Sequence, residues 1–174
     1  MDQFREDIYL FIIPGIIGNV IHMIIVKKNL FSFFAHPVSA ELFGENKTLR
    51  GFVFLPLLIG LVCFVDSILL GPFSLNYFTD LLIGIGLGLS YMLAELPNSF
   101  IKRRIGIAPG KTSNKFGLLQ LLIDKTDSLI GACIFYLFAM NRSYREILLL
   151  FLASIILHIS ISYFLVLMKL KKSI

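Results

Sequence analysis

Five apolar runs, each long enough to cross a bilayer as a helix, constrain what this chain can fold into. A helix needs about 20 apolar residues to span the hydrocarbon core, where every backbone polar group must be hydrogen-bonded within the protein. The runs cover residues 8–26, 52–71, 78–101, 116–140 and 147–168. Because the 174 residues leave little between these runs, we predict an all-α integral membrane protein with about five transmembrane helices, forming a single transmembrane domain over residues 1–174.

The distribution of basic residues predicts how these helices are oriented. Lysine and arginine concentrate in the segments after the first, third and fifth runs and are sparse in the other segments. The positive-inside rule then places the N-terminus outside and the C-terminus in the cytoplasm of a multi-pass protein of the cell membrane. The same rule explains the net charge of +5, so we expect no nucleic-acid partner.

Small residues and prolines inside the runs predict how the helices pack and bend. Glycine recurs at every second position in the third run, at Gly84, Gly86 and Gly88. Small residues allow helix backbones to approach closely in a membrane, so we expect these glycines to serve packing. Prolines predict kinks in three runs, at Pro14, Pro56 and Pro97.

Two carboxylates lie within the fourth run, where a charge is costly. Asp124 and Asp127 are three residues apart and so share one helix face, beside Lys125 and Ser128. A charged residue at the bilayer centre costs about 2.5–3.5 kcal/mol even on mild scales, so such residues usually face a polar cavity. Mg²⁺ would satisfy both carboxylates together with substrate phosphates. The alternative is that Asp124 pairs with a loop lysine and Asp127 only marks a helix end.

A basic cluster follows the third run, over residues 95–104. Ser99, Lys102 and Arg103 share a helix face that would suit a polyphosphate, with Arg104 adjacent. The alternative is that these cations serve only membrane topology.

A third polar cluster, over residues 44–51, precedes the second run on the same predicted side of the membrane. Its amide, ammonium, hydroxyl and guanidinium donors are Asn46, Lys47, Thr48 and Arg50. We expect the three clusters to converge on one substrate site that faces the cytoplasm, because topology alone would not require intramembrane acids.

These motifs resemble those of a known group of enzymes. Ser-Phe-Ile-Lys-Arg-Arg at 99–104, followed by Asp-Lys-Thr-Asp-Ser at 124–128, resembles the signature of the CTP-dependent phosphatidate cytidylyltransferases, the CDP-diacylglycerol synthases. The Gly-x-Asn-Lys-Thr-x-Arg-Gly motif at 44–51 and the short chain are more similar to the CDP-archaeol synthases. Glu95 stands where those relatives have an aspartate, and an unusual Pro-Asn pair follows it at 97–98.

The resemblance implies that CTP and a lipid phosphate form a CDP-lipid and pyrophosphate. It further implies Mg²⁺ as the cofactor, with Asp124, Asp127 and Glu95 as metal ligands and with Lys102 beside the aspartates as a catalytic group. Phosphate and other substrate contacts would come from the remaining polar residues of the three clusters, Asn46, Lys47, Thr48, Arg50, Ser99, Arg103, Arg104 and Lys125.

A second hypothesis, from another class, is a small membrane transporter or assembly subunit whose intramembrane acids bind an ion. Substrate flux without CTP would favour it. The sequence leaves open which lipid phosphate is used and whether the chain forms a homodimer.

Overall fold

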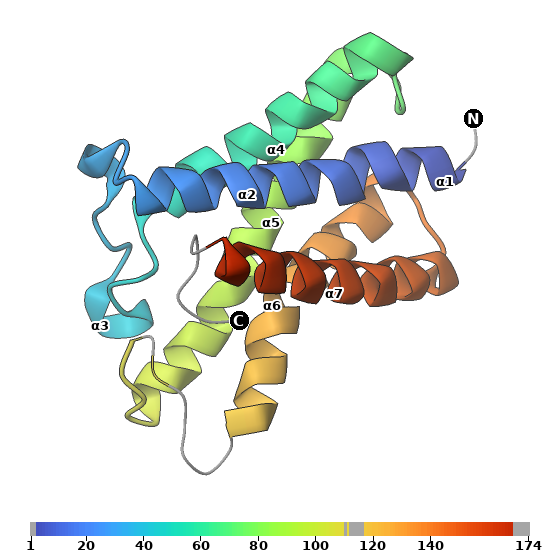
Figure 1. Ribbon diagram of the computed structural model, residues 1–174. Helices are drawn as coiled ribbons and strands as arrows, with labels where there is room; N and C mark the ends of the chain where they lie inside the picture. Colours follow the sequence, from blue (N-terminus) through green and yellow to red (C-terminus); the bar gives the residue numbers. More distant parts are fainter. Residues whose placement is uncertain (1–2, 110, 112–116, 169–174) are drawn as a thin grey trace.

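A computed structural model describes residues 3–109, 111 and 117–168 of the chain (Figure 1). The described part is helical apart from its loops, with one isolated backbone bridge between Pro37 and Thr48. Its elements are α1 (Gln3–Glu6), a π-helical segment (Asp7–Ile12), α2 (Ile13–Lys27), a 3-10 turn (Ser32–Phe34), α3 (Ala40–Phe43), α4 (Leu49–Leu70), α5 (Tyr77–Arg104), α6 (Gly117–Ala139) and α7 (Tyr144–Leu167).

The helices agree with the predicted all-α membrane fold. Among the described residues, four helices are long and apolar enough to cross a membrane: Gln3–Lys27, which joins α1, the π-helical segment and α2, then Leu49–Leu70, Tyr77–Arg104 and Tyr144–Phe164. The fourth predicted run, 116–140, corresponds to α6, in which the described residues contain a shorter apolar segment, Thr126–Ala139. Residue 116 lies outside the described residues, as does the basic segment after residue 168. The orientation of the helices across the membrane stays a prediction.

Helix α5 lies at the centre of the fold. It contacts α4 on one side and α6 on the other, while α2 packs against α4 and α7 packs against α6 (Figure 1). The predicted packing role of the glycines is confirmed at these contacts. A Cβ atom at Gly88 would lie 2.4 Å from Pro56 Cα, and one at Gly84 would lie 2.7 Å from Gly60 Cα. A Cβ at Gly86 would lie 2.1 Å from the Phe135 ring of α6.

The three prolines are accommodated inside or beside long helices. Both α4 and α5 continue as helices through Pro56 and Pro97. Pro14 lies in the first turn of α2, directly after the π-helical segment. Proline cannot donate to the carbonyl four residues earlier, so Leu10 O needs another partner. The buried thiol of Cys63 on α4 supplies it, with Sγ 3.5 Å from that oxygen.

A buried ion cluster ties the N-terminal helix to the α6–α7 loop. Arg142, whose side chain is 4% exposed, lies 2.6 Å from Glu6 Oε2 and 3.0 Å from Asp7 Oδ1. Its guanidinium also lies over the Tyr136 ring, 5.7 Å from the centroid. Burial opposes the charge of Arg142, but Tyr136 and the two carboxylates outweigh it and raise the pKa of the guanidinium above its usual value. This cluster was not predicted from the sequence.

Candidate active site

Two adjoining cavities lie among the helices. The large cavity has a volume of about 570 Å³ and the small cavity about 240 Å³. Four residues line both cavities: Asn46, Lys47, Glu95 and Asp124. These residues come from the loop before α4, from α5 and from α6, so the three polar clusters of the sequence do converge in space.

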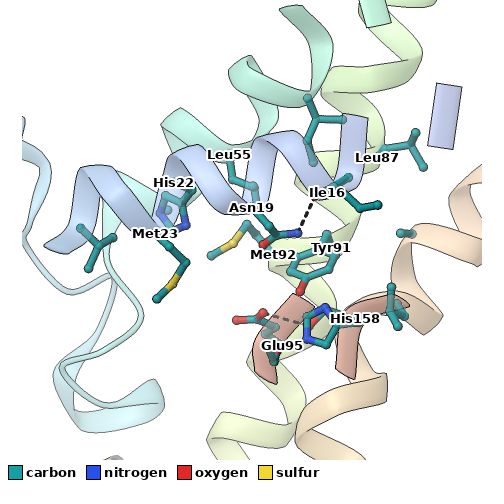
Figure 2. A pocket seen from close by; sticks show the side chains of 18 of the residues that line it. Ile16, Asn19, His22, Met23, Leu55, Leu87, Tyr91, Met92, Glu95 and His158 are labelled. Carbon is teal, nitrogen blue, oxygen red and sulfur yellow. Dashed lines mark hydrogen bonds between the residues drawn. The ribbon is translucent and has the colours of Figure 1, made fainter. Parts of the chain in front are cut away.

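The surface of the large cavity is more apolar than polar. Its walls include Ile16 and Met23 of α2, Leu87 of α5 and Ile161 of α7. Figure 2 shows several of these side chains, with Glu95 and His158 at one end of the view. Such a cavity can accept an apolar chain while its polar end meets the small cavity.

The small cavity holds the acidic pair. Asn98 of α5 donates from Nδ2 to both carboxylates, at 2.7 Å from Asp124 Oδ1 and 2.8 Å from Asp127 Oδ2. Lys102, one helical turn further along α5, places Nζ 2.6 Å from each oxygen of Asp124. The backbone and side chain of Ser128 both donate to Asp127 Oδ1, at 2.7 and 3.0 Å. The alternative pairing of Asp124 with a lysine is therefore observed, but with Lys102 of the cavity.

Glu95 has separate partners. It forms an ion pair with Lys47 of the loop before α4, and its Oε1 accepts a hydrogen bond from Ser128 Oγ at 2.9 Å. No three aspartate, glutamate, histidine or cysteine side chains of the described chain lie together in a way that could hold a metal ion. Asp124 and Asp127 thus share one amide donor, whereas Glu95 has other partners, and the role of all three acids as metal ligands stays a prediction.

Arg103 presents unpaired donors to the small cavity. Its Nε and Nη1 atoms are buried and have no hydrogen-bond partner among the described residues. The side chain lies beside Gly44, where a Cβ atom would be 3.6 Å from Arg103 Nε. Buried donor nitrogens without partners are costly, so this position favours an anion that can accept from them.

The remaining predicted residues divide into those that line a cavity and those that do not. Ser99 lines the small cavity and Thr48 the large one. Arg50 also lines the large cavity, but its Nη1 is engaged 3.1 Å from both Asn29 Oδ1 and Leu30 O, so it braces the loop after α2. Its role as a substrate contact stays a prediction.

Arg104 lies outside both sets of cavity-lining residues. Its guanidinium stacks over the Phe100 ring, 5.1 Å from the centroid, and the residue is exposed. The geometry therefore gives no support to its predicted substrate contact. The side chain of Lys125 lies outside the described residues. Asn98 was missed as a site residue, although the unusual Pro-Asn pair was a signal one turn before Lys102.

Fold and site together define an all-helical, multi-pass membrane protein in which an apolar cavity meets an acidic pair and a set of cations. The chain belongs to the CarS-like CDP-archaeol synthase family, whose model matches residues 6–174. It is 35% identical over 97 residues to a CDP-archaeol synthase of Staphylothermus marinus. That match covers 56% of this chain and 48% of the relative, so the chain spans about half the length of the curated relative that it matches. No solved structure matches the chain.

Proposed function

We propose that this protein is a CTP-dependent lipid-phosphate cytidylyltransferase of the CDP-archaeol synthase type. The substrates would be CTP and a membrane lipid phosphate of the archaetidic or phosphatidic acid type, and the products a CDP-lipid and pyrophosphate. The site would face the cytoplasm, where CTP is found. Membership of the family favours this enzyme over the transporter hypothesis.

The observation that carries the proposal is the junction of the two cavities at Lys47, Glu95 and Asp124. A lipid phosphate whose tails occupy the large cavity would bring its phosphate to this junction. A nucleotide triphosphate in the small cavity would meet the unpaired donors of Arg103. The lipid phosphate could then approach the α-phosphorus of CTP on the side opposite the leaving pyrophosphate, as an in-line displacement requires.

In the proposed reaction, an oxygen of the lipid phosphate attacks the α-phosphorus of CTP. A new P–O bond forms there, and the bond to the bridging oxygen between the α- and β-phosphates breaks. Pyrophosphate leaves with that electron pair. Lys102 and Arg103 would stabilise the negative charge that develops on the phosphates, and no covalent enzyme intermediate is needed.

The acidic pair suits a divalent cation such as Mg²⁺. Magnesium is usually held by one or two carboxylates together with substrate phosphates, and one amide nitrogen lies within 2.8 Å of an oxygen of each aspartate. When bound, the cation would neutralise part of the triphosphate charge. In the structure Lys102 is paired with Asp124. When the substrates bind, its ammonium group would leave Asp124 and contact a substrate phosphate.

The test is nucleotide transfer by variants of the acidic pair. Asp124→Asn and Asp127→Asn should each reduce CTP-dependent CDP-lipid formation by at least about 100-fold, because each removes a charge that the metal requires. Thr126→Ala is the matched control on the same helix, since its hydroxyl donates to the backbone carbonyls of Leu122 and Ile123, at 2.9 and 3.4 Å, and to neither aspartate. Full activity in both asparagine variants would exclude the proposed site.

A further inference from the structure

We propose that Asn98 is a positioning residue, which holds the Asp124 and Asp127 carboxylates in the arrangement that a divalent cation needs. The inference rests on the proposed function, because it takes the acidic pair as the metal site. Asn98 lies in α5, and its amide reaches across to α6 and donates from one nitrogen to both carboxylates, at 2.7 and 2.8 Å. Among the described residues, Asn98 alone has a side chain that donates to both aspartates.

The two carboxylates require such a partner because they repel each other. They lie three residues apart on one face of α6, and both are half-buried. Repulsion between like charges in a partly buried site favours side-chain rotamers that separate them. A shared amide donor offsets this repulsion and draws one oxygen of each carboxylate toward a common point.

Each carboxylate is also fixed from a second direction. Lys102 contacts both oxygens of Asp124 at 2.6 Å, whereas the backbone N–H of Ser128 contacts Asp127 Oδ1 at 2.7 Å. The amide of Asn98 therefore completes the orientation of both side chains and bridges them. Outer contacts of this kind set the orientation of metal ligands in other proteins.

An amide suits this position better than a cation would. Asn98 and Lys102 are four residues apart on α5, so both face α6. Lys102 neutralises Asp124 and competes with any cation that approaches it. Asn98 supplies two N–H donors without adding charge, so the acidic pair keeps its negative charge for the cation. Lys102 thus neutralises Asp124, whereas Asn98 bridges Asp124 and Asp127.

The experiment measures Mn²⁺ binding to the purified full-length protein in detergent, by electron paramagnetic resonance of free Mn²⁺. Asn98→Leu keeps the side-chain size and removes both donors, and Asn98→Ala carries the test if the leucine variant does not fold. Each should weaken Mn²⁺ binding by about 10- to 100-fold, as loss of an outer-shell partner does elsewhere. Asn98→Gln keeps the amide and should weaken Mn²⁺ binding less than the leucine and alanine variants do. Thr126→Ala should bind Mn²⁺ as the wild type does.

If Asn98 had a purely structural role, its substitution would lower thermal stability without selectively weakening metal binding. The positioning role predicts that the Mg²⁺ concentration for half-maximal activity rises, while the KM for CTP at saturating Mg²⁺ stays within about twofold. If folded Asn98→Leu or Asn98→Ala binds Mn²⁺ like the wild type, while Asp124→Asn does not bind it, the positioning role is refuted and the proposed site survives. If the wild type neither binds Mn²⁺ nor forms CDP-lipid with Mg²⁺, both are refuted.

Discussion

Replacing Lys102 with methionine should change metal binding and catalysis in opposite directions. In the structure Lys102 Nζ lies 2.6 Å from both oxygens of Asp124, in the position that a cation would take. Removing the ammonium frees the carboxylate for the metal. The same substitution removes a positive charge that the proposed reaction uses on the phosphates. We therefore expect Lys102→Met to bind Mn²⁺ more tightly and to transfer nucleotide more slowly.

The geometry allows both magnitudes to be worked out. The side chains of Lys102 and Asp124 are 16% and 30% exposed, so the pair is screened less than a surface pair. Surface pairs contribute about 0–1 kcal/mol, and we take about 1–2 kcal/mol for displacing this lysine. This corresponds to Mn²⁺ binding about 5- to 30-fold tighter. Loss of a preorganised charge at the reacting phosphates should reduce kcat by about 100- to 1000-fold.

The assay pairs Mn²⁺ binding without nucleotide with CDP-lipid formation at saturating CTP and metal. Lys111→Met is a matched control, because Lys111 is exposed in the loop after α5 and lines neither cavity. Weaker Mn²⁺ binding by Lys102→Met would refute the reasoning, since the lysine would then support the metal site and not compete with it. Unchanged kcat would refute its contact with phosphate.

Two further predictions concern the fold and are measured by thermal unfolding in detergent. Arg142→Met should remove the ion-pair partner of the half-buried Glu6 and leave Asp7 with only the Tyr136 hydroxyl, at a cost of about 3–5 kcal/mol, and should lower the melting temperature by about 6–20 °C; an unchanged value would show that the cluster does not hold the N-terminal helix. Gly88→Ala should cost about 1–3 kcal/mol and about 2–12 °C, because its Cβ would lie 2.4 Å from Pro56 Cα. Gly15→Ala should not lower the melting temperature, because nothing lies within 4 Å of its Cβ; equal losses in the two alanine variants would contradict the close-packing argument.

Hydropathy predicted the helices well and their polar ends poorly. The second run was predicted over 52–71 and the helix covers Leu49–Leu70. The first run was predicted to begin at residue 8, whereas the helix begins at Gln3. Its polar first turn is stabilised by Arg142, which lies 136 residues from Glu6 in the sequence. A window that averages hydropathy cannot detect such a distant partner.

Helical spacing predicted which polar residues would meet, but not what each would contact. Asp124 and Asp127 do lie together, because a three-residue spacing places them on one helix face. Asn98 was not predicted as a site residue, because the Pro-Asn pair at 97–98 marks the position as unusual but does not indicate that its amide reaches two acids on α6. Arg104 was expected at the site with Arg103, but Phe100 holds its guanidinium elsewhere. The direction of a long side chain depends on its packing neighbours, which the spacing does not specify.

The measurement that tests the central claim most directly is transfer of radiolabel from CTP into lipid by the purified protein with Mg²⁺. Phosphatidic acid and an unsaturated archaetidic acid are offered separately, with the label on the α-phosphate. The account predicts a labelled CDP-lipid with at least one of them, and release of one pyrophosphate for each lipid formed. Folded protein that binds neither CTP nor a divalent cation, and that forms no labelled lipid, would contradict it.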